Sequence, residues 1–195
     1  MKSLIIATNN QGKVREIKAI LGGFYDEILS LKDANIHVEV VEDGKSFHEN
    51  AAKKAIEISL IAKGDVLADD SGLCVEALDN APGIYSARFA GTSSTDKQNN
   101  DKLLELLKNE PNRKAKFVCA LVIANDGKEK LYVEDSAKGE IIDVPKGQNG
   151  FGYDPLFYVA EYDQTFAQIP AEIKNKISHR AKALEKLKKE VSKMV

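Results

Sequence analysis

Short apolar runs alternate along the chain with segments whose apolar residues recur every three or four positions. The run over residues 3–8 predicts a strand, because it is short, apolar and followed by turn-forming residues. Val14, Ile17 and Leu21 then have the spacing of one face of a helix. The chain is therefore expected to open with a strand, a turn over residues 9–12 and a helix.

The next two elements are predicted from alternation and from capping signals. His37–Val41 alternates as a half-buried strand does. Ser46 and Glu49 have the spacing of a capping box, in which each side chain bonds a backbone N–H of the other residue. An alanine-rich stretch follows, so we expect a helix that ends near Lys63–Gly64.

The apolar run that begins at Asp65 is interrupted by three turn-forming residues. Asp70, Ser71 and Gly72 stand between two apolar stretches. Asp, Ser and Gly favour turns, each for its own local reason. We therefore predict a buried strand, a turn at these three residues and a second short strand.

A capped helix and a hairpin are predicted further along. Thr95 and Gln98 again have capping-box spacing and precede a helical pattern that runs to Leu107. Two stretches rich in strand-forming residues flank Asp126 and Gly127, a pair that favours the tight turn of a hairpin.

The last segment, Ala171–Val195, is rich in Lys and Glu and is predicted to be helical, with these residues on or near its buried face: Ile173, Ile177, Leu184, Leu187 and Val191. Strand and helix signals alternate without a linker or a repeat. The fold class expected is α/β, a mixed central β-sheet flanked by helices and divided into two lobes. We treat residues 1–195 as one domain.

Composition narrows the classes of function. The chain is 43% hydrophobic and 30% charged, with a net charge of -2, as in an ordinary soluble globular protein. It has no overall positive field, which argues against broad binding of nucleic acid or of an anionic membrane. The apolar run over residues 4–7 is too short for a signal peptide or a membrane span, so we expect a cytoplasmic protein. Cys74 and Cys119 lie in apolar runs and are predicted to be reduced core residues.

The first candidate for chemistry is the turn "TNNQGK", residues 8–13. A helix N-terminus offers unpaired N–H groups and a partial positive charge, which suit a phosphate, and Lys13 adds a full charge. It is not a P-loop, because Val14 stands where a Ser or Thr is required and Ala7 where the first glycine is required. The alternative is an ordinary strand-to-helix turn with an Asn cap.

The second candidate is the acidic pair Asp69 and Asp70, taken together with Glu42. Adjacent carboxylates at the end of an apolar strand repel each other and lose hydration, and a cation relieves both effects. Oxygen ligands of this kind suit Mg²⁺. Because side chains alternate along a strand, only one of the two aspartates is expected to contact the ion. The alternative is a pair of solvated acids at a strand end.

The third candidate is "NGFGYDPLF", residues 149–157. Phe151 or Tyr153 can stack on the ring of a ligand, while Asp154 accepts hydrogen bonds at its edge. Glycines at 150 and 152 let a ligand approach the backbone closely. The alternative for both aromatic rings is packing in the core.

The fourth candidate is "KNKISHR", residues 174–180. On an unbroken helix Lys174 and His179 lie about 140° apart and do not easily share a ligand. A break at Ser178, a favourable N-cap residue, removes that difficulty. It also directs a new helix N-terminus, with His179 and Arg180, at an anion. The alternative is a basic, solvated helix face.

These stretches together resemble one family, the inosine/xanthosine triphosphate pyrophosphatases, which cleave noncanonical purine nucleoside triphosphates. The resemblance runs nearly end to end through "ATNNQGKVREI", "FHENAAKKA", "LADDSGL", "PGIYSARFAG", "GFGYDPLF" and "KISHRAKAL". It implies a mixed α/β fold with a long central sheet, a nucleotide-binding groove between two lobes, dependence on Mg²⁺ and a homodimer.

The resemblance also implies a role for particular residues. Contacts to the nucleotide are implied for Thr8, Asn9, Asn10, Gln11, Gly12, Lys13 and Ser71, with Thr8, Asn10 and Lys13 on the triphosphate. The base pocket is implied for Phe151, Gly152, Tyr153 and Asp154, closed by Lys174, His179 and Arg180. Glu42 and Asp70 are implied as metal ligands, and Asp70 as the proton acceptor. The family often has Glu-Glu-Thr-Gly where this chain has residues 41–44, so Asp43 is an alternative to Glu42.

The predicted reaction is hydrolysis between the α and β phosphates of ITP, dITP or XTP, which releases a nucleoside monophosphate and pyrophosphate and cleanses the nucleotide pool. Donors from Arg180 and nearby amides favour the keto oxygen at C6 of hypoxanthine and xanthine over the amine of adenine. Two alternatives stay open, a pyrophosphatase with a preference for a modified pyrimidine and a nucleotide-binding module that does not hydrolyse its ligand.

Overall fold

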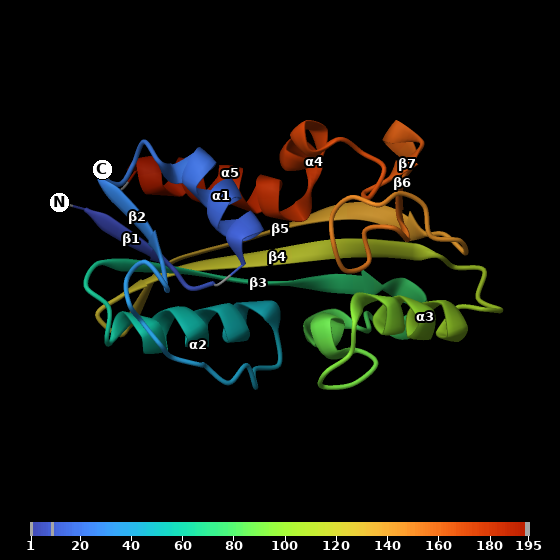
Figure 1. The fold of residues 1–195 in the computed structure, drawn as a ribbon, viewed down its shortest axis with the longest axis horizontal. Helices are drawn as coiled ribbons and strands as arrows, with labels where there is room; N and C mark the ends of the chain where they lie inside the picture. The colour runs from blue at the N-terminus through green and yellow to red at the C-terminus, as the bar shows by residue number, and fades with distance from the viewer. Residues whose placement is uncertain (1, 9, 194–195) are drawn as a thin grey trace. The chain divides into compact units, whose positions relative to one another are not determined.

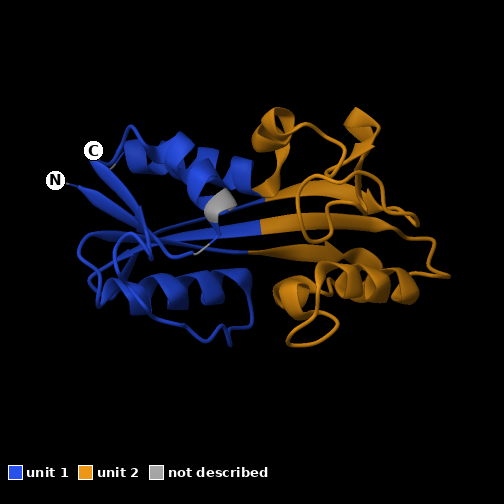
Figure 2. Ribbon diagram, in the orientation of Figure 1, with its two compact units in different colours: residues 1–70, 119–135, 180–195 blue, residues 71–118, 136–179 orange. Residues whose placement is uncertain are grey.

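The computed structural model describes residues 2–8 and 10–193. The chain divides into two compact units, shown in different colours in Figure 2. Unit 1 comprises Met1–Asp70, Cys119–Asp135 and Arg180–Val195, and unit 2 comprises Ser71–Val118 and Ser136–His179.

The strands form a seven-stranded sheet in the order β2-β1-β3-β4-β5-β6-β7. Their bounds are β1 Ser3–Ile6, β2 Glu27–Ser30, β3 Asp65–Val75, β4 Lys114–Asn125, β5 Lys128–Ile141, β6 Phe157–Val159 and β7 Gln164–Thr165. Strand β1 runs parallel to β2 and β3, whereas β6 is antiparallel to β5 and β7. The mixed α/β sheet predicted from the sequence is confirmed.

Helices cover the sheet in each unit. Their bounds are α1 Gln11–Leu21, α2 Phe47–Ser59, α3 Asp96–Leu106, α4 Ala171–Ile177 and α5 His179–Lys193, with short 3₁₀ helices at Glu76–Leu78, Gly83–Arg88 and Ala160–Tyr162. In unit 1, α1 and α5 lie on one face of the sheet and α2 lies on the other (Figure 1). Strand β3 is thus contacted from both faces in unit 1.

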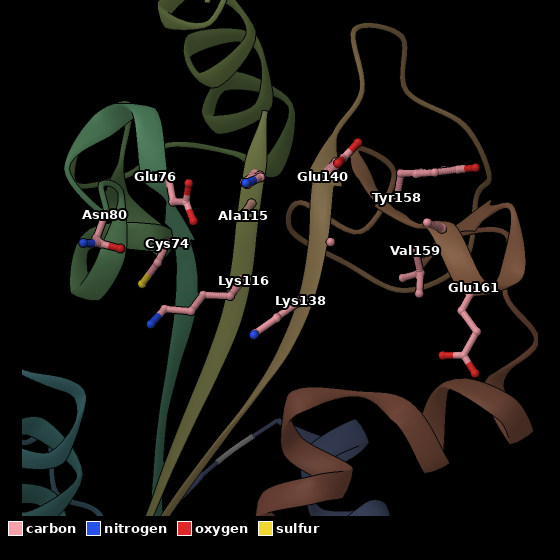
Figure 3. A pocket seen from close by; sticks show the side chains of 13 residues that line it. Cys74, Glu76, Asn80, Ala115, Lys116, Lys138, Glu140, Tyr158, Val159 and Glu161 are labelled. Atoms are coloured by element: carbon pink, nitrogen blue, oxygen red, sulfur yellow. The ribbon is translucent and has the colours of Figure 1, made fainter. Parts of the chain in front are cut away.

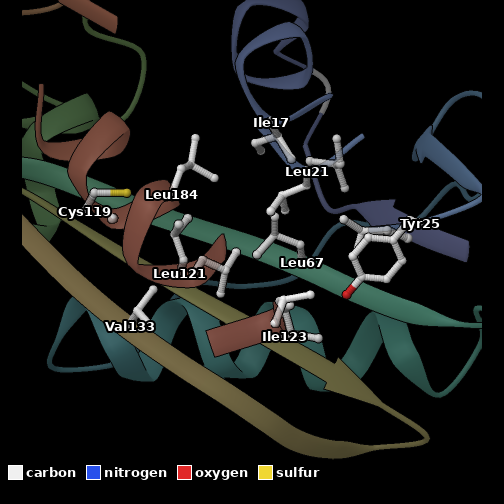
Figure 4. Packing of buried hydrophobic residues seen from close by; sticks show 14 of the residues in the cluster. Ile17, Leu21, Tyr25, Leu67, Cys119, Leu121, Ile123, Val133 and Leu184 are labelled. Atoms are coloured by element: carbon white, nitrogen blue, oxygen red, sulfur yellow. The ribbon is translucent and has the colours of Figure 1, made fainter. Parts of the chain in front are cut away.

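The core of unit 1 is aliphatic and joins both helices of one face to the sheet (Figure 4). Ile17 and Leu21 of α1 and Leu184 of α5 pack in one cluster with Leu67 of β3 and Leu121 of β4. Full burial of such a side chain contributes about 1.5–3 kcal/mol. This packing holds the amino half of β3, which carries Asp69 and Asp70, against α1, which follows the "TNNQGK" turn.

The core of unit 2 is aromatic. The ring centroids of Phe117 and Phe157 lie 4.7 Å apart, and those of Phe157 and Phe166 lie 4.8 Å apart. Their tilted arrangement suits the charge distribution of aromatic faces and edges. Leu73 and Leu103 are buried in the same cluster. Tyr153 and Leu156 belong to the same cluster, so the segment that follows residue 151 packs against the core of unit 2.

Several local signals in the sequence are confirmed. The hydroxyl of Thr95 accepts the N–H of Gln98, whose side chain bonds the N–H of Thr95, which completes the capping box. Asp126 and Gly127 have φ angles of 50° and 69°, as the tight hairpin turn requires. Ser46 caps α2 by accepting the N–H of Glu49 at 3.1 Å. Glu49, however, accepts from Lys45 rather than from Ser46, so only half of that predicted box forms.

Two predictions about the strands are wrong, the strand over residues 37–41 and the turn at residues 70–72. Residues 37–41 form neither strand nor helix, and Val38 and Val41 are exposed, because no neighbouring strand pairs with this stretch. The strand that lies beside β1 is instead β2, Glu27–Ser30. The predicted turn at residues 70–72 is also absent. Leu67 and Leu73, on either side of the polar residues, are both fully buried, and β3 continues through Val75.

Two helix ends differ from the prediction as well. Helix α2 ends at Ser59, because Leu60 and Ile61 are exposed and the chain turns back through bonds from the N–H groups of Ile61 and Ala62 to the carbonyl of Ile58. Helix α1 begins at Gln11, inside the predicted turn. Both errors arise at termini, where tertiary contacts decide the last turn.

Two expectations concern cysteines and membranes. Cys74 and Cys119 are both buried and not joined in a disulfide, as predicted. No helix in the described part of the chain is long and apolar enough to cross a membrane.

Candidate functional site

The carboxylate of Asp69 lies at the centre of a buried group of charges in unit 1. Its Oδ1 forms an ion pair with Lys13 of α1, and its Oδ2 accepts the Nε–H of Arg180 of α5 at 2.9 Å. The thiol of Cys119 lies 3.5 Å from the same Oδ2. Burial alone raises the pKa of Asp69, but the charges of Lys13 and Arg180 outweigh it and hold that pKa well below its usual range.

Lys13 is positioned by the cap of α1. The side chain of Asn10 accepts the N–H of Lys13 at 3.3 Å, and the hydroxyl of Thr8 accepts the N–H of Asn10 at 3.2 Å. Gln11 and Gly12 supply backbone to the first turn of the helix. The predicted junction of strand and helix is thus confirmed, and so is the Asn cap of the alternative interpretation. Phosphate binding at this turn stays a prediction, and Asn9 lies outside the described residues.

Asp70 faces the opposite side of β3 and is bound by α2. Its Oδ2 accepts the side-chain N–H of Asn50 at 3.0 Å. Burial, with a further contribution from the charge of Glu42, raises the pKa of Asp70 to about 6, although Asn50 and Lys54 act in the other direction. The sequence prediction that the two aspartates point to opposite faces is therefore confirmed.

Glu42 is the second carboxylate on this face. It forms an ion pair with Lys54 of α2, whose Nζ also lies 3.4 Å from the carbonyl oxygen of Asp69. Asp43, the alternative considered from the sequence, pairs with Lys53 at 2.6 Å and its side chain is 66% exposed. Only Glu42 of these two acts on the pKa of Asp70. Glu42 is therefore the better candidate ligand.

The acids of this face fit a hard divalent cation. Among the described residues no three His, Cys, Asp or Glu side chains are grouped as a complete metal site. Glu42 and Asp70 nevertheless offer two carboxylates, and the pKa of Asp70 is raised by lost hydration and, to a smaller extent, by the charge of Glu42. Mg²⁺ is commonly held by one or two carboxylates, with substrate phosphates and water completing its shell.

Asp154 organises the candidate loop of unit 2. It is buried and accepts the N–H of Phe151 at 2.9 Å, and it forms an ion pair with Lys174. Gly150 has a φ angle of 78°, and a Cβ there would lie 2.0 Å from the carboxylate of Asp154, so no other residue fits. The loop is further held by a bond from the N–H of Gly152 to Asp96.

The two rings of this loop have different environments. Phe151 is 54% exposed, whereas Tyr153 is 4% exposed and donates its hydroxyl to the carbonyl of Ser86 at 2.7 Å. Tyr153 is therefore packed in the core, as the alternative interpretation of the sequence proposed, whereas Phe151 has an exposed ring; stacking of either ring on a ligand stays a prediction. The ammonium of Lys174 lies 5.6 Å from the centroid of that ring, within range of a cation–π contact.

The predicted break at Ser178 is present. Helix α4 ends at Ile177, Ser178 is extended with φ -67° and ψ 157°, and α5 begins at His179. His179 stacks on Phe117 in unit 2, with ring centroids 4.8 Å apart. Arg180 belongs to unit 1 and also lies 3.5 Å from Glu16. Ser71 is half-buried in β3, and its predicted contact with a nucleotide stays a prediction.

Sequence reasoning missed three residues of the site. The sequence analysis assigned no partner to Asp69 and no role to Asn50 or Lys54. A signal for Asn50 was present, since it falls on the apolar face of α2 with Phe47, Ala51 and Ile58. A polar residue on such a face needs a buried partner.

A cavity of about 660 Å³ lies elsewhere in unit 2 (Figure 3). Its walls include Cys74, Lys116, Lys138 and Tyr158, and none of the predicted site residues lines it. The hydrogen bonds and charges around Asp70 and Asp154, rather than cavity size, therefore identify the candidate site.

Comparison with known proteins gives a consistent result. The model of the Ham1 family matches residues 4–190. A protein named dITP/XTP pyrophosphatase from Clostridium perfringens is 53% identical over 196 residues, with 96% of each chain covered. A protein of the same name from Desulfotalea psychrophila is 48% identical and covers 98% of this chain and 86% of its own length.

Solved structures resemble the fold closely. The Ham1 protein of Staphylococcus aureus has a TM-score of 0.92 and 40% identity, with both chains fully covered (100%). A structure described as nucleoside-triphosphatase / dITP/XTP pyrophosphatase from Mycobacterium abscessus has a TM-score of 0.79 and 38% identity, and the match covers 95% of this chain and 97% of that one.

Proposed function

The chain belongs to the Ham1 family, and from that premise we propose that it hydrolyses dITP, ITP and XTP to the nucleoside monophosphate and pyrophosphate. The observation that carries this proposal is the pair of carboxylates Glu42 and Asp70, each of which is bound by a side chain of α2. Such a pair serves a reaction in which a water molecule attacks a polyanion.

Asp70 is the proposed proton acceptor. A general base works best when its pKa lies near the working pH, and in the metal-free protein burial raises the pKa of Asp70 toward that range, to about 6. The bond from Asn50 fixes the direction of the carboxylate. Asp70 thereby orients an attacking water and takes its proton.

A magnesium ion is the proposed cofactor, held by Glu42 and Asp70. When bound, it neutralises phosphate charge and stabilises the leaving pyrophosphate. The chain's own cations add to this effect. Lys13 lies at the capped start of α1, where N–H groups and the helix dipole also favour a phosphate.

Residues of unit 2, with Arg180 of unit 1, are proposed to supply base recognition. The exposed ring of Phe151 stacks on the purine, and Lys174 and the backbone of residues 151–154 contact its edge. Donors from these groups, His179 and Arg180 meet the oxygen at C6 of hypoxanthine or xanthine. Adenine presents an amine there, and a buried donor left unpaired costs about 1–3 kcal/mol, roughly 5- to 150-fold in rate per contact.

The remaining parts of the proposal concern assembly. We infer that residues 1–195 act as one domain of two lobes, whose nucleotide groove takes the triphosphate on residues of unit 1 and the base on residues of unit 2. We also propose that the protein is cytoplasmic and that it forms a homodimer.

One experiment tests the reaction. Purified protein is incubated with Mg²⁺ and each of dITP, ITP, XTP, ATP, GTP and dUTP, and pyrophosphate and phosphate are measured separately. Pyrophosphate from the first three substrates is the expected result. Single phosphates would refute cleavage between the α and β phosphates, preference for dUTP would refute the base assignment, and no release at all would refute the activity.

A further inference from the structure

Asn50 is a fully buried amide with both of its ends bonded. Its side-chain N–H donates to Asp70 at 3.0 Å, and its side-chain oxygen accepts the backbone N–H of Gly44 at 2.8 Å. A backbone N–H can only donate, so the oxygen of the amide must face Gly44. The N–H end must then face the carboxylate, and the orientation of the side chain is fixed.

The contact with Gly44 leaves no room for a side chain there. A Cβ at Gly44 would lie 2.7 Å from the amide oxygen of Asn50 and 2.8 Å from the Cβ of Glu49. The backbone two residues after Glu42 is thus pressed against the first turns of α2. The next N–H, that of Lys45, is held by Glu49 at 2.7 Å.

Helix α2 therefore contacts both carboxylates of the proposed cation site. Asn50 binds Asp70 directly, and the same amide anchors the segment that carries Glu42. Lys54, one turn further along, pairs with Glu42 itself. Glu42 and Asp70 are far apart in sequence, and one buried amide connects the carboxylate of Asp70 to the backbone two residues after Glu42.

We propose, on the basis of the function proposed above, that Asn50 is a positioning residue that sets the separation of Glu42 and Asp70 for a divalent cation. Asn50 acts through these two carboxylates and touches neither cation nor nucleotide. Loss of the amide therefore weakens cation binding and turnover. It leaves the binding of the nucleotide base, which depends on residues of unit 2, unchanged.

The test measures binding of Mn²⁺ without catalysis. Free Mn²⁺ is followed by electron paramagnetic resonance in the presence of a saturating α,β-methylene analogue of dITP. Asn50→Leu keeps the branching at Cγ and the number of side-chain heavy atoms, and it removes both hydrogen bonds. Residues behind a metal ligand typically change metal affinity by about 10- to 100-fold, and we expect a loss of that size. In parallel, kcat for dITP falls while KM stays within about threefold.

A second variant approaches the contact from the other side. Gly44→Ala keeps Asn50, but the new Cβ at residue 44 presses against the amide oxygen of Asn50. The affinity for Mn²⁺ should therefore fall in this variant too. This variant lies in a partly exposed loop and carries the test if Asn50→Leu does not fold.

The matched control is Ser59→Ala at the far end of α2. Ser59 is also buried, and its hydroxyl accepts the N–H of Gly127 at 2.9 Å, far along the helix from Asp70. The control should lose stability and keep Mn²⁺ affinity. Folded Asn50→Leu or Gly44→Ala with the wild-type affinity would overturn the proposal. Hydrolysis of dITP by the wild-type protein is measured separately. An inactive wild-type protein would refute the proposed function, whereas the role of Asn50 is tested by the affinity for Mn²⁺.

Discussion

Asp69 and Asp70 are consecutive residues of β3, yet their carboxylates are bound from opposite faces of the sheet. Lys13 and Arg180, from α1 and α5, bind Asp69, whereas Asn50 of α2 binds Asp70. The alternation of side chains along a strand produces this separation. One aspartate is therefore neutralised by buried cations, and the other keeps a raised pKa that suits a base.

Asp70→Asn is expected to lower turnover far more than it weakens nucleotide binding. The amide keeps the shape of the side chain and a contact with Asn50, but it cannot take a proton. General-base catalysis commonly contributes about 10²- to 10⁴-fold, which sets the expected loss in kcat. The check is steady-state kinetics with dITP, together with direct binding of the methylene analogue. Turnover within a few-fold of the wild type would show that another group is the base.

The same substitution is expected to stabilise the metal-free protein at neutral pH. The folded pKa of Asp70, about 6, lies above its ordinary value of 3.8, so the folded state binds this proton more tightly than the unfolded state does. The resulting stability is full below about pH 4 and is lost as pH rises through 6. A shift of about two units corresponds to about 3 kcal/mol.

Urea denaturation in EDTA at pH 4.5 and 7.5 measures this effect. Other carboxylates titrate in the same range, so the informative quantity is the difference between Asp70→Asn and the wild type. That difference should favour the variant at pH 7.5 and shrink at pH 4.5. Asp43→Asn, an exposed acid on the same loop as Glu42, should show no such pH-dependent gain.

Asp69→Ala is expected to destabilise the fold severely. Removal of this carboxylate leaves Arg180, which is buried, and Lys13 without their principal counter-charge. Breaking a buried ion pair from one side typically costs about 3–5 kcal/mol. The free energy of unfolding from urea titration at pH 7.5 gives the measurement. Asp43→Ala removes an exposed partner of Lys53 and should change that free energy little, so equal losses for both variants would contradict a special role for Asp69.

Local signals in the sequence predicted the elements that local physics decides. The caps at Ser46 and Thr95 and the turn at Asp126 depend on hydrogen bonds within a few residues, and all three are present. The alternation of Asp69 and Asp70 belongs to the same class, because it follows from strand geometry alone. The break between α4 and α5 at Ser178 was likewise predictable, because serine is a favourable N-cap residue.

Elements that depend on distant partners were not predictable in this way. Residues 37–41 alternate as a strand does but have no neighbour with which to pair, while β2 pairs with β1 despite a weak pattern. The burial of Tyr153 depends on the carbonyl of Ser86, 67 positions earlier in the chain. The roles of Asp69 and Asn50 also require knowing which side chains meet across the core.

Phe151→Ala and Tyr153→Phe together test which ring of the loop contacts the base. Phe151 is exposed, so its truncation should leave stability nearly unchanged and raise KM for dITP. Stacking of a base on an aromatic ring contributes about 1–3 kcal/mol, roughly 5- to 150-fold in affinity. Tyr153→Phe removes only the hydrogen bond to Ser86, so it should lower stability by about 1 kcal/mol and leave KM unchanged. Thermal unfolding and steady-state kinetics on both variants give the two readouts. If KM rises in Tyr153→Phe and not in Phe151→Ala, the buried ring takes part in binding and the assignment of Phe151 is wrong.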